Sequence, residues 1–332
     1  MGIFVLSDKN TFSGTALGLR DGVRDSSDSR EGLEYLDQFT PRTMPNEPTA
    51  AESKTEVRNF WNAEPCGSRY LGATQDFESH ARMRYDLEPH IREFAGFEHA
   101  AGKRVLEIGV GMGADYLEWL KAGAVATGVD LSSASLERAR QRCKEAGYIP
   151  DLREADAEHL PFPDDTFDIV YSYGVMHHSP DPSQCIREAR RVLKPGGTLR
   201  IMIYHHPSLT GLMLWARFGW LHGKSLRRSV YDHLESPGTH SYTKDEARGL
   251  MDGFEHIEFR QEFSPGDLLL NKPSARFQGS FYRLVWRVYP RSLVRALGHR
   301  MGLFLLISAR KPAAENLPSR LEPYSAIRGS PD

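Results

Sequence analysis

Short apolar runs, separated by turn residues and by helix-forming stretches, set the pattern of this chain. Apolar runs cover residues 104–108, 124–130 and 166–172, and again 194–203, 254–263 and 302–310, with a shorter one at 151–155. Residues 182–193 and 76–97 are predicted helices, the second interrupted near Pro89. Strands that alternate with helices in this way predict an α/β fold with a parallel sheet.

The flanking segments differ in composition from this alternating region. Residues 1–52 are rich in Asp, Ser, Thr, Gly and Pro and predict a flexible arm, while 53–101 predict a helical segment. Residues 206–242 form an insertion with an apolar aromatic run at 209–221. Residues 243–311 complete the sheet and contain a second, basic insertion that we expect to be helical. Thr243 and Glu246 predict a capping box, and 312–332 predict a loose tail.

A glycine-rich turn after the first strand gives the clearest sign of a ligand. Gly109, Gly111 and Gly113 stand between that strand and a helix, where the backbone can approach a ligand closely. Asp130 ends the second strand, where a carboxylate can accept ribose hydroxyls. The spacing is G-x-G-x-G rather than G-x-G-x-x-G, and Glu107 precedes the first glycine by two residues. Both features argue against an NAD-linked oxidoreductase.

The segments that follow carry a family resemblance. They are Asp156-Ala157 after the third strand, a Pro-punctuated loop at 158–165, residues 173–178 (Tyr-Gly-Val-Met-His-His) after the fourth strand, and Lys-Pro-Gly-Gly at 194–197. In this order, over about residues 102–205, the chain resembles the class I S-adenosylmethionine-dependent methyltransferases, especially the group with the ubiquinone- and menaquinone-type enzymes. The resemblance implies a doubly wound, mostly parallel, seven-stranded sheet, its last strand antiparallel beside the fifth.

The resemblance also implies the cofactor S-adenosylmethionine and assigns residues to its parts. This ligand has a sulfonium, an ammonium and two ribose hydroxyls but no phosphate, so a carboxylate-rich pocket suits it. The implied cofactor residues are Glu107, Gly109, Gly111 and Gly113 for the methionine part, Asp130 for the ribose, Leu131, Asp156 and Ala157 for the adenine, and Tyr173 between cofactor and acceptor. Arg82, Arg84 or Tyr85 could reach the cofactor carboxylate.

The segments added to this core are expected to close an acceptor pocket. Residues 53–101 and 206–242 would form a lid, with Trp61, Tyr70, Trp215 and Tyr242 as its walls. Cys66 is interpreted as a packed turn residue rather than a thiol facing the pocket.

Histidines are the candidate bases, because methyl transfer requires a base only when the nucleophile carries a proton. Two adjacent pairs, His177-His178 and His205-His206, follow the fourth and fifth strands, at the edge of the sheet where ligands bind. The second pair is preferred. Adjacent side chains diverge, so neither pair predicts a metal site. Tyr70, Tyr173 and Tyr242, or alignment alone, are the alternatives to a histidine.

Composition limits the class of function. The net charge of −2 argues against a nucleic-acid surface, and the three cysteines form neither a disulfide framework nor a zinc motif. No apolar run is long enough to cross a membrane and the N-terminus is not a signal peptide, so a cytoplasmic location is expected. An RNA methyltransferase would bring a basic module or an Asn/Asp-Pro-Pro-aromatic motif, where this chain has Ser172-Tyr173-Gly-Val.

These features predict a methyltransferase that acts on a small molecule at oxygen, sulfur or carbon. A small thiol and a lipophilic, quinone-like acceptor both remain open, since a thiolate is already nucleophilic and the aromatic run at 209–221 suits a lipophilic molecule. A SAM-binding partner subunit without catalysis is the alternative outside this class.

The second insertion is basic. No acidic residue occurs between Asp267 and Glu315, while arginines recur at near-helical spacing: Arg276, Arg283, Arg287, Arg291, Arg295 and Arg300. One interpretation is a solvated helix face that pairs with the acidic arm or with a partner subunit of a homo-oligomer. The other is contact with an anionic phospholipid surface, aided by Trp215, Phe218, Trp220 and Leu221. These aromatic side chains could instead wall a pocket.

Overall fold

A computed structural model describes residues 50–63, 76–234, 238–270, 287–296 and 298–313 of this chain. The predicted arm up to residue 49 and the tail from residue 314 lie outside the described residues. So do Cys66, Tyr70, Arg276 and Arg283.

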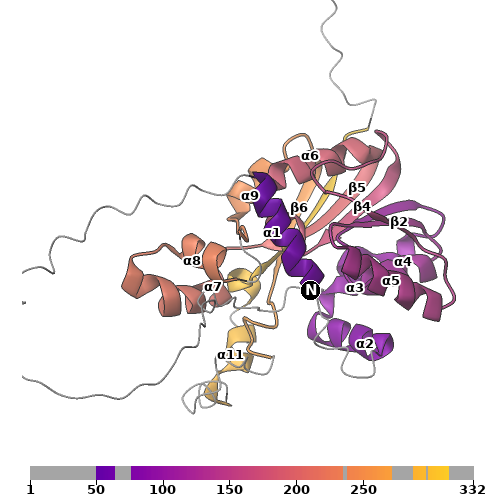
Figure 1. Ribbon diagram of the computed structural model, residues 1–332. Helices are drawn as coiled ribbons and strands as arrows, with labels where there is room; N and C mark the ends of the chain where they lie inside the picture. The colour runs from indigo at the N-terminus through magenta and orange to yellow at the C-terminus, as the bar shows by residue number, and fades with distance from the viewer. Residues whose placement is uncertain (1–49, 64–75, 235–237, 271–286, 297, 314–332) are drawn as a thin grey trace, which may run out of the picture.

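A seven-stranded sheet forms the centre of the molecule, in the order β3-β2-β1-β4-β5-β7-β6 (Figure 1). The strands are β1 (Arg104–Ile108), β2 (Val125–Asp130), β3 (Asp151–Glu154), β4 (Phe167–Tyr173), β5 (Leu193–Tyr204), β6 (Glu255–Glu262) and β7 (Phe304–Arg310). The first five are parallel, whereas β7 runs antiparallel to both β5 and β6. The predicted α/β fold and the antiparallel last strand beside the fifth are confirmed.

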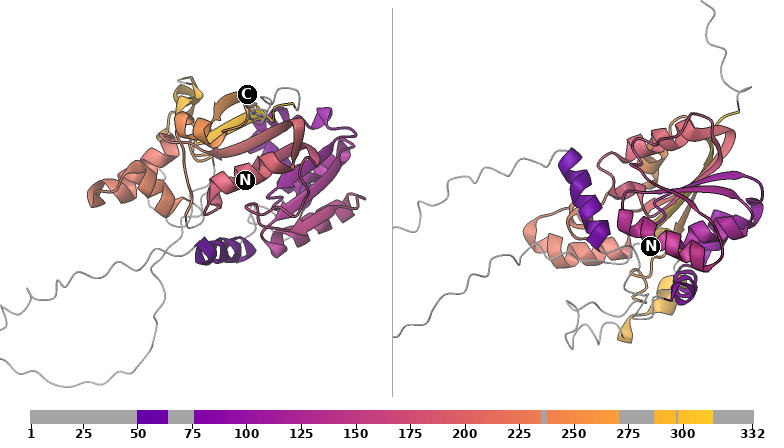
Figure 2. Two further views of the ribbon diagram at one scale, coloured as in Figure 1. Left: turned by 90° about the horizontal axis from the view of Figure 1, so that it is seen from above. Right: turned by 45° about the vertical axis from the view of Figure 1, so that its right-hand side comes forward.

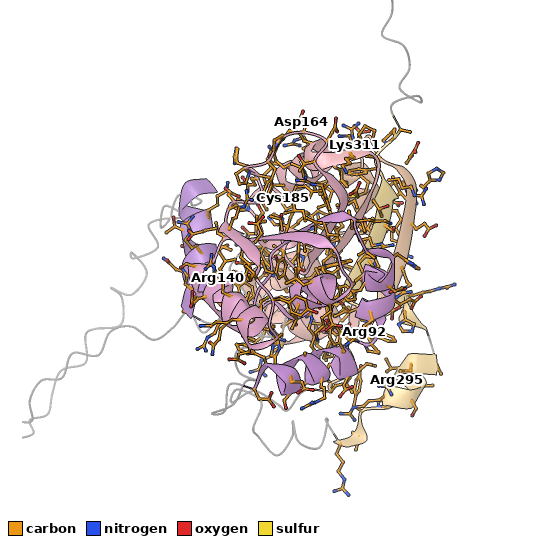
Figure 3. All side chains as sticks on the ribbon, turned by 90° about the vertical axis from the view of Figure 1, so that its right-hand side faces the viewer. Arg92, Arg140, Asp164, Cys185, Arg295 and Lys311 are labelled. Carbon is orange, nitrogen blue, oxygen red and sulfur yellow. The ribbon has the colours of Figure 1, made fainter. Side chains whose placement is uncertain are left out.

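Helices cover both faces of the sheet (Figures 1 and 2). One face packs against α3 (His90–Ala95), α4 (Ala114–Lys121) and α5 (Ser133–Glu145), and the other against α6 (Pro182–Val192) and α9 (Lys244–Leu250). Because strand side chains alternate between faces, Val105 belongs to the first core and Leu106 to the second. Trp119 is fully buried in the first core and Cys185 in the second, whereas Arg140 lies at the surface (Figure 3).

The helix boundaries follow local signals in the sequence. Asp76 caps α2 (Phe77–Leu87) by accepting hydrogen bonds from two backbone N–H groups, and the predicted interruption near Pro89 separates α2 from α3. Thr243 and Glu246 form the predicted capping box at the start of α9. The expected helix near residues 55–61 is α1 (Ala50–Ala63), which begins inside the predicted arm.

The insertion after β5 forms a projection beside the sheet (Figure 1). It consists of α7 (Leu209–Leu214), a π-helical turn (Trp215–Gly219), a short 3-10 helix (Trp220–His222) and α8 (Leu226–His233). Of the second insertion, the structure describes α11 (Arg291–Ala296) and the turn His299–Met301. No helix within the described ranges is long and apolar enough to cross a membrane.

Candidate functional site

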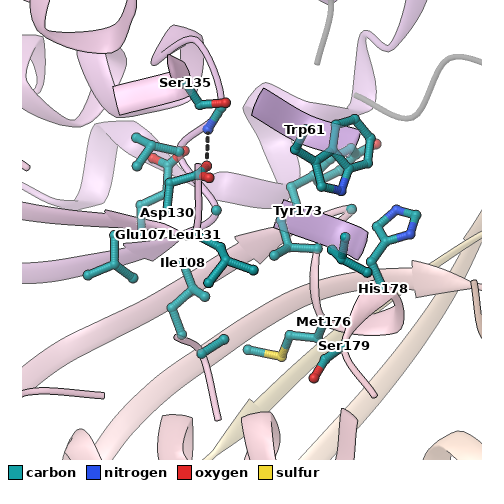
Figure 4. Close-up of a pocket in the computed structure, with 18 of the residues that line it drawn as sticks. Trp61, Glu107, Ile108, Asp130, Leu131, Ser135, Tyr173, Met176, His178 and Ser179 are labelled. Carbon is teal, nitrogen blue, oxygen red and sulfur yellow. Dashed lines mark hydrogen bonds between the residues drawn. The ribbon is translucent and has the colours of Figure 1, made fainter. Parts of the chain in front are cut away.

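A cavity opens at the carboxyl ends of β1, β2, β3 and β4, beside the point where the strand order reverses between β1 and β4. This is where ligands bind in open α/β sheets. Helices α1 and α2 complete its wall. Figure 4 shows Trp61 and His178 on one side, with Glu107, Asp130 and Leu131 on the other. The predicted cofactor residues that line the cavity are Glu107, Gly109, Gly111, Asp130, Leu131, Asp156, Ala157 and Tyr173.

Glycines in the turn after β1 let its backbone approach the cavity closely. Gly109 has a φ of +80°, and a Cβ built on it would lie 2.1 Å from a methyl carbon of Val175. Gly113 is the N-cap of α4 and has a φ of +73°. A Cβ built on Gly113 would lie 2.9 Å from the Cβ of Ala139. Gly113 does not line the cavity and serves the close packing of α4 on α5. Only glycine meets both demands at these positions.

Asp130 is held at the end of β2 by backbone donors. Its Oδ2 accepts a hydrogen bond from the N–H of Gly111 and its Oδ1 one from the N–H of Ser132, both at 2.8 Å. Burial raises the pKa of the Asp130 carboxyl, against the effect of these hydrogen bonds. Two carboxylate oxygens offer about four lone pairs, so the group can still accept two hydroxyl protons.

A buried ion pair lies beside the glycine turn. Arg84, from α2, binds Asp115 of α4 in a two-point contact, with Nε 3.0 Å from Oδ1. Burial opposes ionisation of Asp115, but the charge and hydrogen bonds of Arg84 outweigh it and lower the pKa of that carboxyl. Burial and the nearby Asp115 charge raise the pKa of Glu107 well above its ordinary range. These opposite shifts favour the negative charge on Asp115 and the neutral form of Glu107.

His80 places a defined donor at the same end of the cavity. Its Nδ1 lies 2.9 Å from Nη2 of Arg142, and a guanidinium can only donate, so Nδ1 must accept and the proton must sit on Nε2. His80 lines the cavity and is 3% exposed, and its Nε2 has no hydrogen-bond partner among the described residues. Burial, helped by the Arg142 and Arg84 charges, lowers the pKa of His80 to about 3. The ring is therefore a neutral donor.

Lys54 fastens α1 to the loop that follows β3. Its Nζ lies 2.7 Å from Asp156 Oδ2 and 2.5 Å from Glu158 Oε2. Burial alone would raise the pKa of Asp156, but the hydrogen bonds from Lys54 and from the Glu158 N–H, with the Lys54 charge, lower it. Asp156, Glu158 and His159 have ligand atoms within 4.8 Å of one another, as a metal site would require. The Lys54 ammonium already contacts both carboxylates as their cation, so we interpret the cluster as an ion-pair network.

The opposite side of the cavity is aromatic. Trp61 of α1 stands edge-on to His178, with ring centroids 5.4 Å apart. His178 Nδ1 lies 3.1 Å from the Thr239 hydroxyl, which belongs to the far end of the insertion. Tyr173 ends β4 in the cavity wall, and its hydroxyl lies 2.8 Å from Nε2 of His90. Trp61, Tyr173 and His178 are thus brought together as expected.

The preferred pair of histidines lies elsewhere. β5 continues past β4 alongside β7, so His205 donates its N–H to Leu303 O, and Gln261 contacts its ring at 3.0 Å. His206 lies 3.9 Å from Glu246 of α9, and neither histidine lines the cavity. Burial lowers the pKa of His205 to about 4. Their position does not support the preference for His205 or His206 as base.

His177 lies behind His178, with ring centroids 4.3 Å apart, and does not reach the cavity. It is fully buried, its ring centroid is 3.9 Å from that of Tyr204, and it does not line the cavity. Burial lowers the pKa of His177 well below its ordinary value. Of the four histidines, only His178 lines the cavity.

The described residues of the insertion do not line this cavity, so its position does not support the expectation that it walls the acceptor pocket. Trp215 donates its indole N–H to Lys224 O inside the projection, and Tyr242 packs against the core beneath α9. Neither lines the cavity. The insertion acts indirectly, because Thr239 contacts His178 and the His240 N–H donates to His177 O. The other predicted lid segment, carrying α1 and α2, does line the cavity.

Comparisons with known proteins agree with this geometry. Residues 106–201 match the family model described as "Methyltransferase domain". This part of the chain is a methyltransferase domain. The domain has relatives among curated proteins, and the chain spans between 38% and 57% of the length of the three given next. The activity, acceptor and partners of the whole chain therefore remain proposals.

The relatives of the methyltransferase domain carry different names. Methyltransferase GfsG of Streptomyces halstedii is 44% identical over 31% of this chain and 38% of its own length. Phosphatidylethanolamine N-methyltransferase of Cereibacter sphaeroides is 39% identical over 35% of this chain and 56% of its own. Cycloartenol-C-24-methyltransferase 1 of Oryza sativa subsp. japonica is 31% identical over 59% of this chain and 57% of its own.

The cofactor of this domain is S-adenosylmethionine, and the cavity fits it. The glycine turn leaves backbone exposed where a Cβ would intrude. Glu107 Oε2 has no hydrogen-bond partner among the described residues, and its carboxyl can receive an ammonium. The Nε2–H of His80 can donate a hydrogen bond to a carboxylate.

The sequence did not single out Lys54 or His80. Each lies far along the chain from its partner, Asp156 and Arg142 respectively, so no spacing rule could have found them. Arg84, one of three expected candidates for the cofactor carboxylate, lines the cavity. Arg82 is exposed and pairs with Glu78, while the Tyr85 hydroxyl donates to Asp115.

Proposed function

We propose that this chain transfers a methyl group from S-adenosylmethionine to a small-molecule acceptor bound between α1 and the end of β4. The observation that carries this proposal is a single cavity whose one side holds Glu107 and Asp130 and whose other side holds Trp61 and His178. The bound cofactor supplies a methyl carbon made electrophilic by its sulfonium. The two sides then need only bring a nucleophile into line with that carbon.

We assign the cofactor's parts by charge. The donor of His80, in the positive field of the Arg84 and Arg142 guanidiniums, suits the carboxylate, and Glu107 suits the ammonium. Asp130 suits the ribose hydroxyls. The adenine would lie among Leu131, Asp156 and Ala157, which line the cavity at the ends of β2 and β3.

The acceptor side is built to exclude water. Trp61, Val57 and Met176 present apolar surface there, and the Lys54 ion pairs hold α1 in the cavity wall. An aromatic, apolar wall suits an acceptor with a hydrophobic body and its nucleophilic oxygen, sulfur or carbon near His178. A lipophilic, quinone-like molecule meets this description, and a small thiol requires only the closed apolar space.

We propose His178 as the proton acceptor when the nucleophile is a hydroxyl or an activated carbon. Its ring lies in the cavity wall and is held by the Thr239 hydroxyl and by Trp61. His178→Ala should lower kcat by roughly 10²–10⁴-fold with the KM for S-adenosylmethionine unchanged. His206→Ala is the matched control, because His206 lies outside the cavity. Equal activity in both variants would remove His178 from the mechanism.

Binding calorimetry with wild-type protein and Asp130→Ala tests the cofactor assignment. Asp130→Ala removes two charge-assisted hydrogen bonds of about 1.5–3 kcal/mol each, so the Kd for S-adenosylhomocysteine should rise more than tenfold. A rise of less than threefold, or saturable NAD binding, would contradict the assignment. Formation of S-adenosylhomocysteine with a panel of quinols and thiols tests catalysis. Tight binding with no turnover on any acceptor would favour the non-catalytic partner subunit.

A further inference from the structure

Apolar side chains are exposed on the projection that follows β5. At its tip, Trp220 is 65% and Leu221 81% exposed, and Leu212 and Met213 of α7 are each more than a third exposed. Exposed apolar side chains grouped in this way mark interaction surfaces. None of the four lines the cavity, so binding of cofactor or acceptor there does not account for them.

Basic side chains predominate around this tip. No Asp or Glu occurs between Glu188 and Asp232, a stretch that includes the whole tip. Arg217 is exposed on the turn that joins α7 to the tip. Lys224, just after the tip, and Arg228 of α8 share Asp232, which leaves a net positive charge among these three residues.

A second segment with the same character lies around α11. Val288 is 64% and Leu293 58% exposed. Arg287 and Arg295 are exposed among them, and neither forms an ion pair within the described part of the chain. Their immediate sequence is free of acidic residues, which are absent between Asp267 and Glu315.

One buried residue, Asp267, contacts both segments through its carboxylate and its backbone oxygen. Asp267 accepts hydrogen bonds at 2.8 Å from the N–H of Thr210, at the start of α7, and from the N–H of Leu303, just before β7. Its backbone oxygen accepts the Tyr289 hydroxyl, also at 2.8 Å, just ahead of α11. Both segments stand out from the sheet (Figures 1 and 2) while sharing this anchor. They are held in a fixed relation to each other.

We propose that the projection and the α11 segment together bind the surface of an anionic phospholipid bilayer. Trp220 and Leu221 would enter the headgroup region, where tryptophan is favoured, while Arg217, Arg287 and Arg295 would meet lipid phosphates. A second copy of the chain fits less well, because a twofold interface would place these cations against their own copies. The phosphates of a nucleic acid could contact the arginines, but an exposed leucine such as Leu221 would contribute little to its binding. The proposal does not depend on the methyl-transfer reaction.

The test is flotation of the full chain with vesicles of phosphatidylcholine, with and without phosphatidylglycerol. Binding should require phosphatidylglycerol and should weaken severalfold between about 0.1 M and about 1 M salt. Trp220→Ser/Leu221→Ser should weaken partitioning at least roughly tenfold and abolish the blue shift of tryptophan emission that membrane insertion produces. Arg287→Glu/Arg295→Glu should weaken it by at least roughly tenfold.

Matched variants on other surfaces control for general effects. Val125→Ser/Ile149→Ser removes two apolar side chains that are 61% and 97% exposed, and Lys103→Glu/Lys144→Glu reverses two exposed charges. Both controls should bind vesicles like wild type, and all variants should keep their affinity for S-adenosylhomocysteine. No vesicle binding in low salt, equal binding to neutral vesicles, or equal loss in the controls would overturn the proposal. So would a dimer that Trp220→Ser/Leu221→Ser dissociates in the absence of vesicle binding.

Discussion

Replacement of His80 tests the charge assignment of the cavity most directly. Arg142 is 2% exposed, has no carboxylate partner among the described residues, and donates to His80 Nδ1. Burial lowers the pKa of Arg142 to about 10, so the guanidinium remains charged at neutral pH. The neutral His80 ring therefore presents its Nε2 proton in a positive potential. The carboxylate is the single anionic group of S-adenosylmethionine, and we expect it to bind there.

The size of the effect follows from the type of hydrogen bond. A bond to a charged acceptor contributes about 1.5–3 kcal/mol, and each 1.4 kcal/mol is a factor of about ten in Kd. His80→Phe keeps a ring of similar size but has no donor. We expect it to raise the Kd of S-adenosylhomocysteine by roughly 10- to 100-fold.

A ligand that lacks the carboxylate separates this role from a structural one. Calorimetry should compare S-adenosylhomocysteine with 5′-methylthioadenosine, which keeps the adenine and ribose but has no amino-acid end. His80→Phe should leave the Kd of methylthioadenosine within about threefold of wild type. An equal loss for both ligands would mean that His80 only supports the fold, and no loss for either would refute the assignment. Circular dichroism confirms that the variant is folded.

Three further results are expected. Gly109→Ala should lower the free energy of unfolding by roughly 2–5 kcal/mol, because its Cβ would meet Val175 and its φ is left-handed. Gly147 has the same kind of φ but no atom near its Cβ position, so Gly147→Ala should lower that free energy by only about 1–2 kcal/mol. Urea unfolding measures both. Binding of S-adenosylmethionine should release a proton from Glu107, so the binding enthalpy measured by calorimetry should depend on the ionisation enthalpy of the buffer. Glu107→Gln should remove this dependence. A wild-type enthalpy that is the same in all buffers would contradict the protonated state of Glu107. Finally, burial lowers the pKa values of His80, His177 and His205, so these rings take up protons only when the chain unfolds. Each should therefore reduce the free energy of unfolding by about 1.4 kcal/mol per pH unit below about 6.5. Urea midpoints that do not change between pH 7 and pH 5 would contradict their burial as neutral rings.

The strands and the cofactor end could be predicted because their signals are local. The glycine turn, the acidic residue at the end of β2 and the capping box each depend on a few neighbouring positions, and all three were found in the expected place. The antiparallel β7 was expected from the family resemblance. Parallel strands end at one edge, so a list of strand ends was enough to collect Glu107, Asp130 and Tyr173.

The acceptor side could not be predicted in the same way. His178 and His205 both follow strands at the same edge, and the choice between them depends on where each strand leads. β4 lies next to β1 and so ends at the cavity, whereas β5 lies beyond it and continues along β7. The aromatic run after β5 also indicated a pocket wall, yet it folds into a projection. The hydrophobic pattern of a sequence indicates which side chains are buried or in contact, but it does not indicate which surface they contact.

The division of charge within the cavity explains why one ligand orientation is favoured. Arg84 is neutralised by Asp115, but Arg142 has no such partner, so the α2 end retains an excess positive charge that His80 presents to the ligand. The opposite end presents Asp130, which has only neutral backbone donors. A ligand with an anionic amino-acid end and a neutral, hydroxyl-bearing ribose matches this arrangement in one direction only. Reversal would place a carboxylate against Asp130, so the sulfonium is always presented at the same point between Glu107 and the aromatic wall.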